Sequence, residues 1–337
     1  MKVAVVMTVK NEARLLRQNV LYHLGIGVHK IFVYLDKTTD NGAETIKDLE
    51  AVVINESVVA KTYQDKPYLE KFWSNALEHH TARQCLNTYD AMQTCKAEQI
   101  DWLISLDADE LFLSSINNDL SLKNFFEEAK QKEADVISLR PMEVVAKKMA
   151  YNYVMQEETL FKTQKNFQSK FDQIYHKIYD PYNQTHKTVS FWLGHTMGKA
   201  VIRVSNNIIP DNVHRYIALD GAKLNIVSLG YLLHYHIYDF EDFIKKFQNF
   251  KERPDTFLSG NKIEDLKSLW IKLVNDPNYT PEYLKVYFEE NLLFGPTKLK
   301  GLKKTRVFNI FKRKEVAVVN IDLPKQILTP VMIREKV

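Results

Sequence analysis

Residues 101–113 read DWLISLDADELFL, an apolar run that ends in three carboxylates within four residues. The run itself is typical of a buried strand, and the carboxylates belong to Asp107, Asp109 and Glu110. Carboxylate oxygens are hard ligands that suit Mg²⁺, Mn²⁺ or Ca²⁺, and the D-x-D spacing places two of them on one side of an extended backbone. We therefore expect Asp107 and Asp109 to share a divalent cation. The alternative interpretation is a solvated acidic loop after a core strand.

Strand and helix patterns alternate on the N-terminal side of this run. Val3–Val9 is continuously apolar and rich in β-branched residues, as in strands buried on both faces, and residues 11–24 repeat apolar positions at helical spacing. Such alternation predicts an α/β fold with a mostly parallel central sheet flanked by helices. The strand patterns cover 3–9, 30–35, 52–54 and 102–106, and the helix patterns cover 11–24, 43–50 and 68–98.

The second half of the chain has weaker patterns. We expect strands at 135–139, 199–204 and 224–236, followed by helices from 239 onward, near 262–274 and near 281–293.

Polar residues follow three of the predicted parallel strands. Glu12 comes shortly after the first strand, Asp36 after the second, and Asp107 and Asp109 after the strand at 102–106. Open parallel sheets bind ligands beyond the carboxyl ends of their strands. These residues are therefore expected to gather at one site.

Composition limits the class of protein. The 337 residues are 45% hydrophobic and carry a formal net charge of +4, which favours a folded chain and gives little argument for nucleic-acid binding. The two cysteines, Cys85 and Cys95, offer no disulfide framework or metal-ligand spacing. No signal-peptide pattern and no apolar stretch of ~20 residues is present, so we expect a cytoplasmic protein.

Ten short motifs together resemble the family 2-type glycosyltransferases, and most closely the branch related to family 92, over about residues 1–252. This resemblance implies a GT-A-type fold and an inverting, metal-dependent transferase of the hexosyltransferase type that uses a nucleotide-sugar donor. The first six motifs are TVKNE at 8–12, YHLGIG at 22–27, VYLD at 33–36, DNG at 40–42, RQ at 83–84 and DWLISLDADE at 101–110. The later four are GKAVIR at 198–203, VH at 213–214, LHYH at 233–236 and FEDFIKK at 240–246.

The resemblance also implies the metal ligands. Asp109 binds the metal, Asp107 contacts the metal, its bound water or the donor ribose, and a late histidine completes the site, since imidazole suits Mn²⁺. We prefer His234 over His236 for that ligand. Glu110 is either a further acid of the site or a helix N-terminal residue.

Four more residues are implied on the donor side. Asp36 stands where related enzymes bind the nucleobase of a UDP-sugar, although an Asx-type turn would explain it equally well. Thr8 and Glu12 are candidate nucleotide contacts, with helix capping as the alternative for Asn11 and Glu12. Arg83 is expected near the donor, and a solvated helix-face arginine is the alternative.

An inverting transferase needs a general base for the acceptor hydroxyl, which is most simply an Asp or Glu. Glu143 is the first candidate and Asp172 the second. The usual tryptophan-and-glycine pattern is absent near Glu143, which leaves the acceptor class open. His214 resembles the family's histidine near the acceptor, and a structural role is the alternative.

Residues 298–314 contain eight Lys or Arg and no acid, interleaved with apolar residues. Such a segment can lie on an anionic membrane surface, at the inner face of the membrane, where lipid-linked acceptors reside. The alternative is a solvated basic tail.

The sequence thus predicts a catalytic domain at 1–252, with a nucleotide-sugar half at 1–140 and an acceptor half at 141–252, and a helical, basic extension at 253–337. The predicted reaction moves a sugar from a UDP-sugar to a carbohydrate or lipid-linked acceptor with Mn²⁺ or Mg²⁺, and the family association is polysaccharide biosynthesis. The rivals are a sugar nucleotidyltransferase, which the glycine-free first loop disfavours, and a non-catalytic nucleotide-sugar-binding protein.

Overall fold

The computed structural model divides into two compact units, each described by itself. The first comprises Met1–Pro141, Met197–His234 and Asp322–Val337, and the second comprises Met142–Thr196 and Tyr235–Ile321. The structure describes residues 1–117, 121–162, 197–205, 207–251, 265–297 and 318–334, with short pieces at 254, 256, 258, 299, 306–307 and 311–312.

The sheet of the first unit has the strand order β3-β2-β1-β4-β8-β6. Its first four strands are parallel, whereas β8 is antiparallel to both of its neighbours. The strands are β1 (Val3–Val9), β2 (Lys30–Leu35), β3 (Val52–Glu56), β4 (Trp102–Leu106), β5 (Glu110–Leu113), β6 (Val136–Val144), β8 (Ala200–Arg203), β9 (Ile208–Pro210), β10 (Tyr216–Ala218) and β11 (Ile226–His234), and the last residues of β6 belong to the second unit. The helices are α1 (Ala13–Gly25), η1 (Ala43–Thr45), η2 (Ala60–Tyr63), η3 (Pro67–Leu69), α2 (Glu70–Trp73), α3 (His80–Ala97), α4 (Leu122–Gln131) and α11 (Leu323–Arg334).

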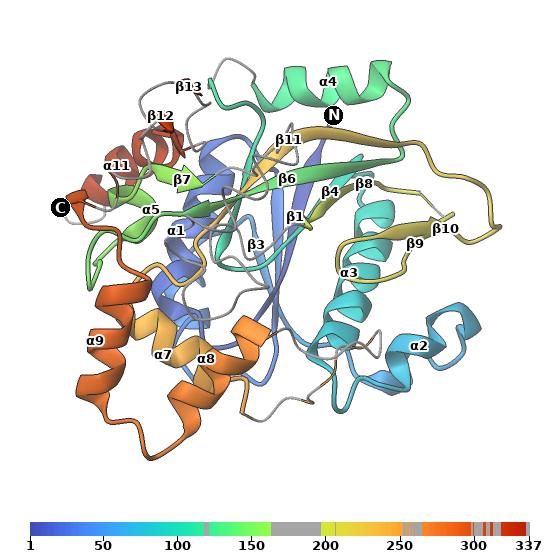
Figure 1. Cartoon of the computed structure of the whole chain (residues 1–337). Helices are drawn as coiled ribbons and strands as arrows, with labels where there is room; N and C mark the ends of the chain where they lie inside the picture. The colour runs from blue at the N-terminus through green and yellow to red at the C-terminus, as the bar shows by residue number, and fades with distance from the viewer. Residues whose placement is uncertain are drawn as a thin grey trace. The chain divides into compact units, whose positions relative to one another are not determined.

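Every residue of β1 is buried because helices cover both faces of the sheet (Figure 1). Side chains alternate along a strand, so Val5 packs in the same cluster as Leu16 of α1, while Val6 packs with Met92 of α3 on the other face. This two-sided burial explains why β1 reads as an unbroken apolar run rather than an alternating one.

A smaller antiparallel pair, β5 with β11, extends this core. Gly230 lies in β11 with φ +65°, and a Cβ there would come within 2.9 Å of the Phe125 ring and 3.0 Å of the Leu113 carbonyl oxygen. Only glycine allows the strand to pass this closely.

The second unit contains α5 (Val154–Glu157), β7 (Leu160–Lys162), α7 (Phe240–Gln248), α8 (Asp265–Asn275), α9 (Pro281–Asn291), β12 (Arg306–Val307), β13 (Phe311–Lys312) and β14 (Val318–Asn320). Strand β7 pairs with the end of β6 and with β14. Phe243 and Phe247 of α7 pack in an aromatic core with Trp270 and Phe288. The helix predicted from residue 239 onward is therefore present.

The predicted fold class, α/β with a mostly parallel central sheet flanked by helices, is confirmed. Two helix predictions were too long: residues 43–50 form only the short η1, and the 68–98 pattern breaks between α2 and α3. Strand β5 was not predicted, because a run of four residues is too short to give a clear periodic signal. Within the described residues, no helix is both long and apolar enough to cross a bilayer. The predicted domain boundaries stay predictions.

Candidate functional site

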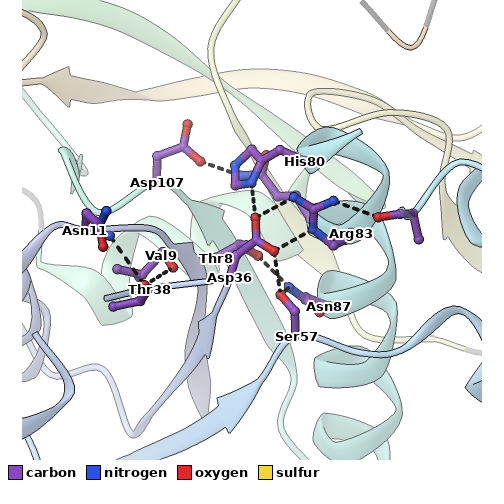
Figure 2. Close-up of polar contacts among 12 residues, drawn as sticks. Thr8, Val9, Asn11, Asp36, Thr38, Ser57, His80, Arg83, Asn87 and Asp107 are labelled. Atoms are coloured by element: carbon purple, nitrogen blue, oxygen red, sulfur yellow. Dashed lines mark hydrogen bonds and ion pairs between the residues drawn. The ribbon is translucent and has the colours of Figure 1, made fainter. Parts of the chain in front are cut away.

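The polar residues at the ends of the parallel strands meet one face of α3. Thr8 and Asp36 come from β1 and β2, and Asp107 follows β4. Across from them, α3 presents polar side chains at the i, i+3, i+4, i+7 spacing of one helix face. Figure 2 shows this arrangement, with Asp36 between its helix partners and Asp107 pointing toward His80. The residues of the α3 face are His80, Arg83, Gln84 and Asn87.

Asp36 is fully buried, and both of its oxygens are bound. Arg83 donates from Nε to Oδ1 at 2.5 Å and from Nη2 to Oδ2 at 2.9 Å, and His80 Nδ1 lies 2.6 Å from Oδ2. Burial raises the pKa of Asp36. The hydrogen bonds and charges of His80 and Arg83 lower this pKa by more, so that it lies well below its usual range. Asp36 is therefore a fixed anion.

Asn87 holds the end of β1 and the segment after β3 in place. Its Nδ2 donates to Thr8 Oγ1 and Ser57 Oγ, both at 3.0 Å, and its Oδ1 accepts from the Val58 N–H at 2.8 Å. Thr8 is buried in this network. The network ties these two segments of the site to α3.

The loop after β1 is organised by Asn11 and Asp40. Asn11 has φ 57°, and its Oδ1 accepts from the Thr39 N–H at 2.8 Å, so it does not cap α1. The first turn of α1 is instead capped by Asp40, whose Oδ2 accepts from the Ala13 N–H at 2.8 Å. Glu12 is the N-cap residue of α1, with no side-chain capping bond.

Asp107 lies among three other polar groups. Gln84 Nε2 donates to its Oδ1, and Lys199 Nζ lies 2.9 Å from its Oδ2. Its backbone N–H donates to Glu110 Oε2 at 2.7 Å. Burial raises the pKa of Asp107, but the charge and hydrogen bond of Lys199, together with the charge of His80, leave the pKa lowered.

Glu110 turns back toward the start of the loop and is buried. Burial raises the pKa of Glu110 to about 7. The charge of Lys199 lowers this pKa, and the charge of Asp107 raises it. The predicted role as a helix N-terminal residue is wrong, because Glu110 begins β5.

Helix α1 holds the D-x-D loop from its buried side. Asn19 Nδ2 donates to the carbonyl oxygens of Ala108 and Glu110 at 2.9 and 2.7 Å. His23 Nε2 accepts from the Phe112 N–H at 3.2 Å, while its Nδ1 lies within 2.9 Å of Asn19 oxygens. Burial lowers the pKa of His23 to about 4, which keeps the imidazole neutral and Nε2 an acceptor. The loop backbone is thus fixed by buried amide and imidazole groups.

Asp109 and His234 come together at the ends of the β5–β11 pair. His234 Nε2 lies 3.4 Å from Asp109 Oδ2, and their side chains are 7% and 12% exposed. Two ligands ~2.1 Å from one octahedral ion lie ~3 Å apart when adjacent, and carboxylate with imidazole suits Mn²⁺. The donor set therefore fits a divalent cation.

The remaining predicted residues that the structure describes have partners of their own. Glu143 belongs to the second unit, where it is buried and lies 3.2 Å from Lys162 Nζ. His236 also belongs to that unit, and its Nδ1 is 3.0 Å from Lys246 Nζ. His214 Nδ1 lies 3.1 Å from the Gly198 carbonyl oxygen. Asp172 and most of the basic segment 298–314 lie outside the described residues.

Sequence reasoning missed several residues that shape this site. His80 and Asn87 had a readable signal, because with Arg83 and Gln84 they form a polar stripe at helical spacing on an otherwise buried helix. Lys199 had none beyond its place in a motif, since its partners lie about 90 residues earlier and pairing over that distance leaves no periodic trace.

One family model matches most of this chain. A model of glycosyltransferase family 92 matches residues 3–268. A glycosyltransferase-like protein of Arabidopsis thaliana is 23% identical over 207 residues, covering 58% of this chain and 45% of that protein, so the match spans less than half of its length.

Among solved structures, glucosyl-3-phosphoglycerate synthase from Mycobacterium tuberculosis, in complex with phosphoglyceric acid, aligns at TM-score 0.31 and 9% identity over 97% of this chain and 91% of that chain. HddC from Yersinia pseudotuberculosis aligns at TM-score 0.31 and 11% identity over 74% of this chain and 100% of that chain. Likeness at these TM-scores carries no argument about activity.

Proposed function

Because this chain belongs to glycosyltransferase family 92, we propose that it is a metal-dependent, inverting glycosyltransferase that uses a nucleotide-sugar donor. The donor is a UDP-sugar, the transferred group is a hexose, and the acceptor is a glycan or a lipid-linked glycan. The observation that carries the proposal is the buried Asp109–His234 pair beside Asp107, at the end of the parallel strands.

Transfer of a sugar from a nucleotide-sugar requires positive charge near the nucleoside diphosphate leaving group. When bound at Asp109 and His234, Mn²⁺ or Mg²⁺ would neutralise the negative charge that grows on the departing nucleoside diphosphate. The α1 network supports this role, because it holds the D-x-D backbone rigidly through Asn19 and His23.

The donor side of the proposal uses the cluster around Asp36. Asp36 is a permanent anion that Arg83 holds in one orientation, and we propose that it accepts the imide N–H of a uracil ring when His80 moves away from Oδ2. Thr8, near the end of β1, and Glu12, in the loop after it, are the proposed nucleotide contacts. Asp107 is proposed to accept a donor hydroxyl.

The acceptor side rests on the second unit. We assign the general base to Glu143, with Asp172 as the second candidate, because an acceptor hydroxyl must lose its proton as the sugar bond forms. We propose that the eight Lys and Arg of residues 298–314 attract a lipid-linked acceptor at the inner face of the membrane, in a cytoplasmic enzyme.

The proposal is tested by measuring UDP release from a panel of UDP-sugars, with and without Mn²⁺. Asp109→Asn is expected to lower Mn²⁺-dependent turnover at least ~100-fold, because it removes a charged metal ligand. The matched control is Asp101→Asn at the opposite end of β4, where the side chain is 53% exposed. Wild-type turnover in Asp109→Asn would remove Asp109 from the site. A wild-type protein that binds UDP without releasing it from any donor would be a non-catalytic binding protein.

A further inference from the structure

Lys199 is a buried cation next to the D-x-D motif, and nothing in the proposed function uses it. Its side chain is 2% exposed, and its Nζ lies 2.9 Å from Asp107 Oδ2 and 4.0 Å from Glu110 Oε2. We propose that Lys199 is the internal counter-ion of this motif: it positions Asp107 and restricts the motif to a single divalent cation, held by Asp109 and His234. The inference rests on the proposed function only for the metal itself.

The backbone at residues 198 and 199 is held closely against β6. Gly198 passes so close to β6 that a Cβ there would lie 1.8 Å from the Leu139 carbonyl oxygen. The Leu139 N–H donates to the Lys199 carbonyl oxygen at 3.0 Å. Glycine at 198 is therefore required for the pairing that aims Lys199 at Asp107.

The charges of the three groups depend on one another. Burial lowers the pKa of Lys199. The charges of Asp107 and Glu110 together raise this pKa by more, so that it lies well above its usual range. A buried ammonium ion is stable only when carboxylates compensate it, and two carboxylates this close are stable only with a cation between them. Lys199 is thus a permanent positive charge built into the motif.

This charge decides where a divalent cation can bind. An ion shared by Asp107 and Glu110 would lie within a few ångströms of the ammonium group and be strongly repelled in a buried site. Gln84 and Lys199 already occupy one oxygen each of Asp107. Among the described residues of the first unit, Asp109 and His234 therefore remain as the metal-binding pair, and Asp107 is left as an oriented acceptor for the donor.

The test measures Mn²⁺ affinity and stoichiometry by electron paramagnetic resonance of free Mn²⁺, without donor. Wild-type protein is expected to bind one ion. Lys199→Met should bind Mn²⁺ about tenfold more tightly or take up a second ion, because a positive charge next to the site is lost. Measured at about pH 8.5, where Glu110 is ionised, Glu110→Gln should bind Mn²⁺ about tenfold more weakly, because a negative charge is lost. Lys199→Arg keeps the charge and is the matched control, expected to keep wild-type affinity.

If Lys199→Met does not fold, the double variant Lys199→Met/Glu110→Gln is used instead. It removes one positive and one negative charge, so no buried charge is left uncompensated. Its Mn²⁺ affinity should then exceed that of Glu110→Gln about tenfold and return close to wild type. Equal affinities in all folded variants would overturn the role of Lys199 and leave the proposed function intact. A wild-type protein without any Mn²⁺ binding would overturn both this inference and the proposed metal dependence. Release of UDP without metal would in that case still support a transferase.

Discussion

Asp36 keeps its charge without any contact with solvent, because Arg83 and His80 bind both of its oxygens. A buried carboxylate depends on such partners, since loss of one partner leaves an uncompensated charge. Arg83 is equally committed, because its Nη1 also donates to the Ala76 carbonyl oxygen at 2.6 Å. The functional and the stabilising roles of Asp36 are therefore inseparable.

Replacing Arg83 with Met should lower the free energy of unfolding by about 3 kcal/mol, because Asp36 would remain buried with His80 alone. Urea denaturation monitored by circular dichroism measures this. The control is Arg17→Met, whose partner Asp48 is 57% exposed, and which should cost about 1 kcal/mol or less. The double variant Asp36→Asn/Arg83→Met should regain part of the loss. Equal effects of Arg83→Met and Arg17→Met would contradict the buried ion pair.

At this scale the sequence identifies acidic residues better than their partners. Asp107 and Asp109 stand out because charges end an apolar run, and the end of a strand is a local feature. The partner of each comes from a distant segment: Lys199 for Asp107 and His234 for Asp109. Such pairs depend on how β8 and β11 join the sheet, which no local pattern encodes.

Between elements, α1 and β5 are joined by buried polar groups rather than by apolar packing alone. Tyr22 donates its hydroxyl to the Phe112 carbonyl oxygen at 2.8 Å, and His23 accepts from the Phe112 N–H. The apolar spacing of α1 predicts this helix correctly, but not that its Asn and His face the core. Amphipathic patterns miss polar groups that are satisfied in the interior.

The neutral His23 predicts a pH-dependent stability. Its pKa is about 4 in the folded protein against 6.5 when unperturbed, so the unfolded chain takes up the proton first as pH falls. The contribution of neutral His23 to the free energy of unfolding is complete above pH 6.5. It is lost as pH falls from 6.5 to about 4, by up to about 3 kcal/mol. Urea unfolding at several pH values should show this slope in wild type and a smaller slope in His23→Gln. An identical slope in the variant would contradict the assignment.

On the scale of the whole molecule, the first unit is assembled from three separate parts of the sequence. Its last part is α11, which packs on α1 and buries Leu328 completely. The alternating N-terminal half was predictable because each βαβ step is local. The return of residues 197–234 and of α11 to the same unit was not, because long-range pairing leaves no periodic signal.

The contribution of α11 can be measured with one substitution. Leu328→Ala should lower the free energy of unfolding by about 3 kcal/mol, because it leaves a cavity in a closed core. Gln326→Ala, on the exposed side of the same helix, should change it by less than about 0.5 kcal/mol. Differential scanning calorimetry of both variants checks this. Similar melting temperatures for the two would show that α11 adds little to the unit.

The late arrival of α11 has a consequence for biosynthesis. A ribosome that adds about 5–20 residues per second needs roughly 15–60 s to travel the approximately 300 residues from α1 to α11. Throughout that interval the surface of α1 that α11 later covers remains open to the translation environment. Chaperones that recognise apolar surface can bind the nascent chain during this time. The yield of folded protein on expression should therefore rise with the amount of these chaperones.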